Sequence, residues 1–313
     1  MVKTAVLMAT YNGQAFILSQ LDSIRRQTLQ PDYVLMRDDG STDQTVALVT
    51  DYITRHQLAG WSITRNSKNL GWRLNFRQLM SDATELDVDY IFFSDQDDTW
   101  YADKNQLQVQ MMQKHPQIDL LSADIDIETI GDAATVPHNY QFADSQEALL
   151  SKYPLDYTYH NYRQGWTFCM RHSFLKTIIK HYSKDLVVSH DNLTTGIAGL
   201  LGTGYNLNQA VGLHRRHGGN ASGHLLNIHS THARQIYELN LVLGYFTIAK
   251  AVLHEKQSKK EARITQYYHF YQQRLENARS RHLWKTLQQM CFEGEYYDTF
   301  SNRIRDLIFI FKK

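Results

Sequence analysis

Short apolar runs alternate with segments of helical periodicity through the first 130 residues of this 313-residue chain. The runs that predict strands are TAVLMAT (4–10), YVLM (33–36), WSIT (61–64), DYIFFS (89–94) and IDLLSADIDI (118–127). Between the first two runs, Ile17, Leu21 and Ile24 recur at the spacing of one helix face. Strands that are apolar along their length and separated by amphipathic helices are typical of a mainly parallel sheet with helices on both faces. We therefore predict an α/β fold for this part of the chain.

Polar and aromatic residues collect directly after these predicted strands, at positions 10–12, 38–39, 66–73 and 95–98. The segment RDDGSTDQT (37–45) alone carries three acids, more than a tight turn requires. In open α/β sheets, ligands bind beyond the carboxyl ends of the strands. The sequence therefore predicts one binding site, built by several separate loops along that edge of the sheet.

Charge and cysteine usage exclude several classes of protein. The chain has 33 Lys and Arg against 32 Asp and Glu, so its net charge of +1 gives no reason to expect a nucleic-acid partner. Cys169 and Cys291 form no CxxC motif, which fits a reducing compartment. The first apolar run ends at Tyr11, too early for a signal peptide, and no run approaches the roughly 20 apolar residues of a spanning helix. We expect a cytoplasmic protein.

The chain changes character after residue 130. A tyrosine-rich stretch to about residue 164 has weak periodicity and predicts a long irregular region. We expect GWTFCMR (165–171) to form a strand, followed by two helices and a strand that ends in the glycine-rich segment HRRHGGNASG (214–223). Beyond about residue 224, helix-spaced apolar residues and a basic stretch predict a mostly helical region. Two parts result, 1–223 and 224–313.

The segment SDQDD (94–98) is the strongest chemical feature of the sequence. Asp95 and Asp97 stand two residues apart at the exit of a buried strand, where both carboxylates can face one Mg²⁺ or Mn²⁺ ion with phosphate oxygens completing its shell. A turn with solvated acids is an equally good interpretation of this segment alone. The residues from Asp95 to Thr99 also fit the DxDxT pattern of haloacid-dehalogenase-like phosphatases, but that pattern follows a first strand and here about three βα units precede it.

Taken in order, TYNG (10–13), DDGSTDQT (38–45), NLGW (69–72), SDQDD (94–98), HD (190–191) and HRRHGGNASG (214–223) resemble the motifs of the inverting GT-A glycosyltransferases of family 2. The resemblance covers about residues 3–223. It implies a GT-A fold, which is a Rossmann-like, mainly parallel sheet with helices on both faces. It further implies a nucleotide-sugar half at about 1–98 and an acceptor half at about 99–223. Within the family, the chain looks most like rhamnosyltransferases of streptococcal-type rhamnose polysaccharide synthesis.

The resemblance implies roles for the residues of the first half. Thr10 and Tyr11 look like part of the nucleotide cradle, and Asp39 like the carboxylate that accepts the N–H of a pyrimidine base. Asp38 either braces the loop or meets the ribose. Two further candidates, near the base and the diphosphate, are Asn69 and Arg73, since a guanidinium matches phosphate oxygens. For Arg73, a position on a solvated helix face is the alternative.

The resemblance also implies the metal site and the catalytic base. Asp97 is the expected ligand of Mn²⁺ or Mg²⁺, with Asp95 on the ribose or the metal and His217 as a third ligand or a diphosphate contact. Asp191 matches the base that takes the proton of the acceptor hydroxyl, and Asp98 is the reserve candidate. A helix-capping role is the alternative for Asp191.

Trp166 looks like an aromatic side chain that contacts the acceptor sugar, and core packing is an equally good interpretation. The expected function is transfer of L-rhamnose from dTDP-L-rhamnose, with inversion, to a lipid-linked saccharide of a cell-wall or capsular polysaccharide. A hexosyltransferase that uses a UDP-sugar is one alternative, and a catalytically inactive nucleotide-sugar-binding protein is another. At the C-terminus, an apolar stripe along a predicted helix consists of Phe300, Ile304, Leu307, Ile308 and Phe311. It predicts peripheral contact with the inner face of the cell membrane, with internal packing or a homodimer contact as the alternatives.

Overall fold

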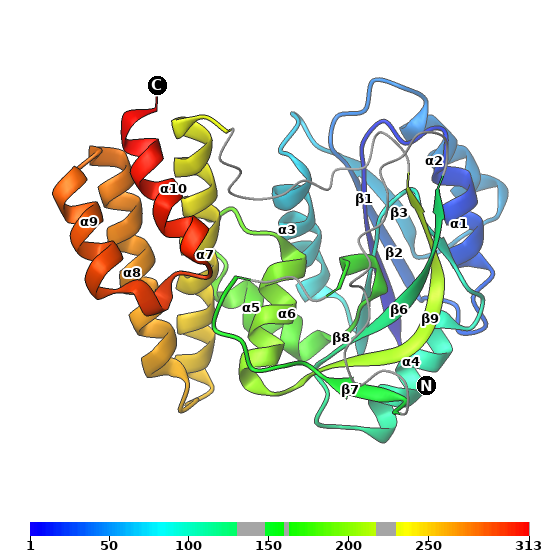
Figure 1. The fold of residues 1–313 in the computed structure, drawn as a ribbon. Coiled ribbons are helices and arrows are strands. Elements are labelled where there is room, and N and C mark those ends of the chain that lie inside the picture. Colours follow the sequence, from blue (N-terminus) through cyan, green and yellow to red (C-terminus); the bar gives the residue numbers. More distant parts are fainter. Residues whose placement is uncertain (130–147, 160–162, 217–229, 313) are drawn as a thin grey trace.

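The computed structural model describes residues 1–129, 148–159, 163–216 and 230–312. Within these residues, nine strands form one sheet that carries helices on both faces, and four further helices extend it on one side (Figure 1). The order along the sheet is β3-β2-β1-β4-β8-β6-β9-β5, with β7 also paired to β9. The predicted α/β architecture with a helical C-terminal region is confirmed.

The first half of the sheet is parallel throughout. Its strands are β1 (Thr4–Thr10), β2 (Tyr33–Asp38), β3 (Trp61–Arg65) and β4 (Tyr90–Ser94). The helices that connect them are α1 (Ile17–Arg25), α2 (Thr45–Arg55) and α3 (Trp72–Asp82). After β1 the chain adds β2 and β3 on one side, and it then returns to add β4 on the other side. In open α/β sheets, ligands bind at such a reversal of strand order, here at the carboxyl ends of β1 and β4.

The second half of the sheet mixes parallel and antiparallel pairs. Its strands are β5 (Thr99–Trp100), β6 (Leu120–Thr129), β7 (Leu150–Lys152), β8 (Cys169–Arg171) and β9 (Gly204–Arg216). Its helices are α4 (Lys104–Lys114), α5 (His172–His181) and α6 (His190–Leu201). The parallel pair is β6 with β9, whereas β8 runs antiparallel to both β4 and β6. The strand predicted over 165–171 is shorter than expected, because Gly165–Thr167 forms a 3₁₀ turn and only Cys169–Arg171 joins the sheet.

Alternate residues of β1 belong to two hydrophobic cores, one on each face of the sheet. Val6 and Met8 pack in the core that contains α1 and α4, whereas Ala5 and Leu7 pack in the core that contains α3, α5 and α6. This alternation follows from the two-residue period of a strand. Because both faces are covered, the strand must be apolar at every position, which explains the run TAVLMAT.

The C-terminal region consists of helices, the first of which packs against α5 and α6 on one side of the sheet (Figure 1). They are α7 (His232–Glu255), α8 (Glu261–Ser280), α9 (Leu283–Phe292) and α10 (Phe300–Phe311). Phe246 and Leu253 of α7 lie in the same core as the residues of α3, α5 and α6, so the hydrophobic core is continuous between the two regions. Helices α6 and α7 approach so closely that a Cβ atom on Gly196 would lie 2.4 Å from Tyr245 Oη.

Helix α7 differs from the sequence expectation that no segment approaches a membrane span. Among the described residues, α7 is the one helix that is long enough and apolar enough to cross a membrane, with a mean hydropathy of 1.4 over its most apolar window. However, 61% of its apolar window is buried inside the protein. It lies at the centre of the helical region, where a soluble core helix meets the same criteria.

Candidate active site

The loops after β1 and β2 are fastened to each other by hydrogen bonds. The backbone N–H of Asn12 donates to Ser41 Oγ at 2.9 Å, and that of Gly13 donates to Thr45 Oγ1 at 2.8 Å. In return, the side-chain oxygen of Asn12 accepts the backbone N–H of Thr42 at 2.8 Å. The hydroxylic and amide side chains of the two motifs therefore build one rigid wall at the carboxyl edge of the sheet.

Asp38 is a brace within this wall. It is fully buried and accepts hydrogen bonds from Thr10 Oγ1 (3.1 Å), from the backbone N–H groups of Gly40 (3.1 Å) and Ser41 (2.8 Å), and from the Ser41 hydroxyl. These donors occupy the lone pairs of both carboxylate oxygens. The geometry therefore supports the bracing role of Asp38 rather than contact with a ribose.

Asp39 holds the next loop of the site. Its oxygens accept the backbone N–H groups of Leu70 and Gly71, each at 2.8 Å, and the side-chain amide of Asn66 at 2.9 Å. A carboxylate offers about four lone-pair positions, so roughly one position remains for a ligand N–H. Asn69 is exposed at the rim, and its side-chain oxygen accepts the Gly71 N–H at 3.0 Å.

Gln96 joins the loop after β1 to the loop after β4. Its side-chain oxygen accepts the backbone N–H of Tyr11 at 2.9 Å, and its side-chain nitrogen donates to the Tyr11 carbonyl at 2.9 Å. The Tyr11 ring is 48% exposed, as expected for a ring that can stack on a base. Sequence reasoning treated Gln96 only as the spacer between two acids. The amide side chain of Gln96 could have indicated this role, because an amide can accept the N–H and donate to the C=O of the same backbone residue.

Asp95, at the end of β4, is under the electrostatic influence of three other carboxylates, one of them from a distant segment of the chain. Burial raises the pKa of Asp95 well above its usual range, and the negative charges of Asp98, Asp97 and Asp191 raise it further. The contribution of Asp191 is informative, because this residue is far from the other three in sequence. A carboxylate whose pKa is raised by burial and by neighbouring acids at a ligand-binding edge is typical of a functional site.

Asp98 is fixed by a residue of β9. Its side chain is fully buried, and its Oδ1 atom lies 2.6 Å from Nδ1 of His214. Burial raises the pKa of Asp98 to about 6, although the contact with His214 opposes the rise. Strand β5 pairs with β9 at Thr99 and Leu213, which carries His214 to this position. From the sequence, a role is assigned to His217 and none to His214. Both histidines belong to the same HRRH motif, which indicated a functional segment without telling which histidine contacts the acids.

Asp191 lies in the first turn of α6, after the N-cap residue Ser189. It therefore does not occupy the capping position, although a negative charge in the first turn is favourable to the helix dipole. His190 packs its ring against Phe76, with ring centroids 3.9 Å apart, and this contact orients the start of the helix. The neighbouring Gly165 leaves no room for a side chain, because a Cβ atom there would lie 2.4 Å from Asp191 Oδ1. This close approach explains why 165–167 departs from the predicted strand.

Two of the remaining candidates differ in their surroundings. The Arg73 guanidinium lies over the Trp72 ring, 4.2 Å from its centroid, and the residue is half-buried at the start of α3. Trp166 is only 1% exposed and stacks on His214, with ring centroids 6.2 Å apart. These surroundings support the core-packing interpretation of Trp166, and its contact with an acceptor sugar stays a prediction.

The acidic cluster has the chemistry of a divalent-cation site. Carboxylate oxygens are the ligands that Mg²⁺ and Mn²⁺ prefer, and a cation would relieve the repulsion among the four acids. Asp98 Oδ2 is buried and accepts no hydrogen bond within the described residues. Among those residues, no group of three or more side chains is arranged to hold a metal ion as it stands. His217, the expected third ligand, lies outside them.

Comparison with curated proteins finds relatives over about a third of the chain. The dTDP-rhamnosyl transferase RfbG of Shigella flexneri is 38% identical over 97 residues, which cover 31% of this chain and 34% of that protein. The O-antigen chain rhamnosyltransferase RfbN of Salmonella typhimurium is 32% identical over 96 residues, which cover 31% of this chain and 28% of that protein. The match thus spans about a third of the length of each relative.

Comparison with solved structures finds the same fold along nearly the whole chain. The structure of S. aureus TarS 1–349 in complex with UDP matches 95% of this chain and 93% of its own, with a TM-score of 0.58 and 16% identity. The mannosyltransferase PcManGT from Pyrobaculum calidifontis, in complex with GDP-Man and Mn²⁺, matches 98% of this chain and 85% of its own, with a TM-score of 0.53 and 14% identity.

The model of the family described as glycosyl transferase family 2 matches residues 5–186, which is more than half of the chain. This range includes the loops after β1 and β2, the acids after β4, and the strands of the sheet from β1 to β8. The sequence motifs, the GT-A-like fold and the family match agree, and this protein belongs to glycosyl transferase family 2.

Proposed function

We propose that this glycosyltransferase transfers L-rhamnose from dTDP-L-rhamnose, with inversion, to a lipid-linked saccharide of a cell-wall or capsular polysaccharide. The reaction would take place at the cytoplasmic face of the membrane. The names of RfbG and RfbN support rhamnose as the transferred sugar. The observation that carries the proposal of catalysis is the approach of Asp191 to the acids that follow β4.

Asp191 is the proposed general base. In an inverting transfer, the acceptor oxygen bonds to the anomeric carbon while the bond from that carbon to the diphosphate oxygen breaks, and its electron pair leaves with dTDP. The acceptor hydroxyl gives its proton to a carboxylate oxygen of Asp191. Asp191 Oδ1 is buried 2.7 Å from His190 Nε2, whereas 18% of the side chain remains exposed, so an acceptor can reach the carboxylate. Asp98 is less suited, since its Oδ1 is already engaged by His214.

The donor is proposed to lie at the carboxyl ends of β1 and β4. Tyr11 would stack on the base, the remaining acceptor position of Asp39 would take the base N–H, and Arg73 would meet the diphosphate. Asp97 and Asp95, together with His217, would hold Mn²⁺ or Mg²⁺. The bound cation would neutralise charge on the departing diphosphate.

A UDP-sugar is the alternative donor. The TarS structures in complex with UDP and with UDP-GlcNAc support it, since uracil and thymine present the same N–H to Asp39. A catalytically inactive binding protein is less well supported, because such a protein has no need for a base carboxylate near the donor site. A DxDxT phosphatase is disfavoured by the fold, because SDQDD follows β4 rather than the first strand.

Calorimetry with a panel of nucleotide sugars would test the donor. With Mn²⁺ present, dTDP-L-rhamnose should bind more tightly than dTDP-glucose, UDP-glucose and UDP-GlcNAc. Tighter binding of a UDP-sugar would replace rhamnose with the alternative. Transfer should then be followed with the preferred donor and a lipid-linked acceptor. An anomeric configuration in the product that matches that of the donor would contradict inversion.

Asp97→Ala tests the proposed metal role in the same titrations. We expect the variant to lose the increase in donor affinity that Mn²⁺ causes, because the ion loses its main carboxylate. Asp103→Ala is the matched control, since Asp103 is an exposed acid just before α4 and outside the site. Wild-type metal dependence in Asp97→Ala would remove Asp97 from the metal site.

A further inference from the structure

Large exposed apolar side chains concentrate on the last two helices. Apart from Met1, the large hydrophobic residues that are at least 70% exposed in the described part of the chain are Trp284 (74%), Phe292 (82%), Phe300 (70%) and Phe311 (73%). Ile304 and Ile308, at 43% and 37%, continue the exposed stripe of α10 between its two phenylalanines. Gathered exposed apolar residues of this kind mark an interaction surface rather than ordinary protein surface. We call these six residues the α9–α10 surface.

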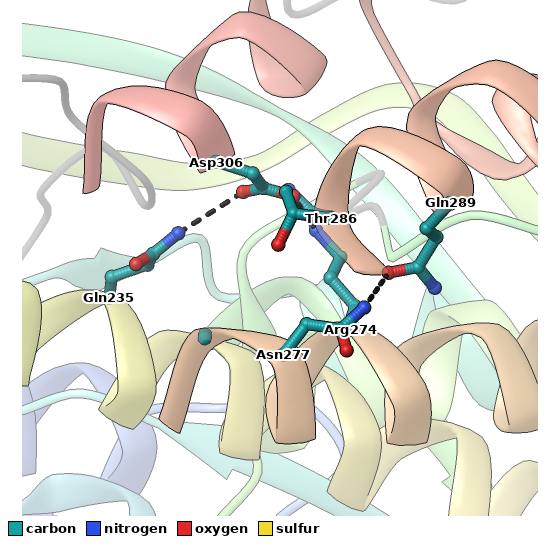
Figure 2. Close-up of a pocket in the computed structure, with 7 residues that line it drawn as sticks. Gln235, Arg274, Asn277, Thr286, Gln289 and Asp306 are labelled. Atoms are coloured by element: carbon teal, nitrogen blue, oxygen red, sulfur yellow. Dashed lines mark hydrogen bonds and ion pairs between the residues drawn. The ribbon is translucent and has the colours of Figure 1, made fainter. Parts of the chain in front are cut away.

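Helix α10 exposes one apolar stripe, whereas its buried side combines Arg305 and Asp306 with Phe309 and Ile310. Arg305 and Asp306 are 5% and 6% exposed, the reverse of their usual position on a helix at a protein surface. Asp306 accepts two hydrogen bonds from Arg274 of α8, at 2.6 and 2.9 Å, and one from Gln235 of α7, at 3.1 Å (Figure 2).

This polar contact fixes the rotation of α10. The group surrounds a cavity of about 10 Å³, which is close to the space that one water molecule needs. If α10 turned its apolar side inward, Asp306 would leave Arg274 as a buried charge without its carboxylate partner, which is strongly destabilising. The outward display of the apolar stripe is therefore a stable property of the fold.

The charges around the α9–α10 surface favour an anionic partner. Arg281 and Lys285 are exposed at and near the start of α9, and Lys312 follows α10. Among the acids of this segment, Glu295 pairs with Arg263 at 3.0 Å, whereas Glu293 accepts from the uncharged amide of Gln289 at 3.0 Å and keeps its negative charge. Over residues 281–313 the sequence has six Lys and Arg against four Asp and Glu, so the segment carries a net charge of +2.

We propose that the α9–α10 surface docks on an anionic lipid bilayer, with both helices lying in the plane of the headgroups. Helix α10 has 12 residues and is thus about 18 Å long, well short of the ~30 Å hydrocarbon core, so it cannot span the membrane. Apolar and aromatic side chains beside Lys and Arg suit the boundary between headgroups and acyl chains. The C-terminal end of α10 and the carboxyl end of β1 lie at the same, upper side of the molecule in Figure 1.

A second copy of the chain is the competing occupant of this surface. In a two-fold dimer the same surface meets itself, so the cationic rims of the two copies would face each other and repel. An anionic bilayer instead complements the rim. This inference concerns where the protein sits and does not depend on which sugar it transfers.

Co-sedimentation of the full chain with vesicles tests the proposal. The wild type should pellet with phosphatidylcholine vesicles that contain a third phosphatidylglycerol, and salt should weaken the binding. The vesicle partition coefficient of the variant Phe300→Ser/Phe311→Ser should be at least about tenfold lower, because two aromatic side chains that the bilayer would bury are lost. Both residues are exposed, so the variant should fold normally. Leu18→Ser is the matched control, since Leu18 is exposed on α1 and should bind as the wild type does.

Trp284 supplies a second, independent measurement. Its fluorescence should shift to shorter wavelength when anionic vesicles are added, and the shift should be absent in Trp284→Phe. Equal pelleting of the wild type and Phe300→Ser/Phe311→Ser would overturn the proposal, as would a wild type that does not bind anionic vesicles. Light scattering that shows a lipid-free dimer, converted to monomer by the same double substitution, would assign the surface to a second copy instead.

Discussion

Carboxylates in the helical region and at the edge of the sheet differ in the charge of their neighbours. In the helical region, Asp306 is matched by Arg274 and Gln235, so its charge is neutralised within the protein (Figure 2). At the edge of the sheet, Asp95 has other acids as its neighbours, and their charges raise its pKa. A buried charge without an opposite charge is costly unless the protein gains something by keeping it. The difference separates carboxylates that hold the fold from those that await a ligand.

The same distinction applies inside the active site. Asp38 and Asp39 are as buried as Asp98, yet backbone N–H groups satisfy much of their hydrogen-bonding capacity. They shape the loops that receive the nucleotide. In the group formed by Asp95, Asp97, Asp98 and Asp191, burial and neighbouring acids raise the pKa of Asp95 and Asp98, and this group carries the expected chemistry. Substitutions of Asp38 or Asp39 should therefore lower mainly the stability, whereas substitutions in the second group should lower mainly the turnover.

The largest expected effect on turnover comes from Asp191→Asn. Loss of a general base typically lowers the rate about 10²–10⁴-fold, whereas the amide keeps the shape of the site. We expect kcat to fall by that factor while donor affinity and the melting temperature stay near those of the wild type. Asp185→Asn, at an exposed acid in the loop before α6, is the control and should turn over normally. Near-normal transfer by Asp191→Asn would move the base elsewhere, with Asp98 as the first candidate.

The largest expected effect on stability comes from Asp306→Ala. Removing one partner of a buried ion pair typically costs about 3–5 kcal/mol, because Arg274 would remain buried without its partner. Urea unfolding should show a loss of this size. The double variant Arg274→Met/Asp306→Leu should recover much of it, since no buried charge remains. A single variant as stable as the wild type would show that the pair does not hold α10.

A smaller effect, on both stability and turnover, is expected from Gly165→Ala. The added methyl group would lie 2.2 Å from His190 Nε2 and 2.4 Å from Asp191 Oδ1, so the start of α6 must shift. Overpacking of this kind typically costs about 1–3 kcal/mol. We expect a moderate loss of stability together with a fall in kcat, and little change in donor affinity. A variant that loses donor affinity but keeps kcat would contradict a link between Gly165 and the base.

The smallest effect on stability is expected from substitution of Glu255, an exposed carboxylate. The side chains of Lys180 and His181 contact Glu255 and lower its pKa to about 2. This lowered pKa contributes stability above the ordinary pKa of a glutamate, and that contribution is lost as the pH falls towards 2. Because the site is solvated, Glu255→Gln should change the melting temperature little at pH 7 and should not affect turnover. A loss comparable to that of Asp306→Ala would show that burial is not what separates the two groups.

Sequence patterns predict the sheet well because its signals are local. Runs such as TAVLMAT report burial on both faces, and the predicted first four strands are confirmed. Patterns report much less about which acids have partners, because those partners come from distant segments. His214 meets Asp98 across 116 positions, and Arg274 meets Asp306 across 32. For the same reason, the stripe on α10 predicts a helix but does not tell which of its faces is buried.

The close packing of α6 on α7 has a consequence for how this family can diversify. Gly196 lies against the Tyr245 hydroxyl, and the same helix α6 carries Asp191 in its first turn. A helical region exchanged for that of another glycosyltransferase would have to reproduce this fit, or the first turn of α6 would be displaced. Recombination between family members should therefore succeed more often when the break falls before α6 than when it falls between α6 and α7. The acceptor-side helix and the C-terminal helices are expected to be inherited as one unit.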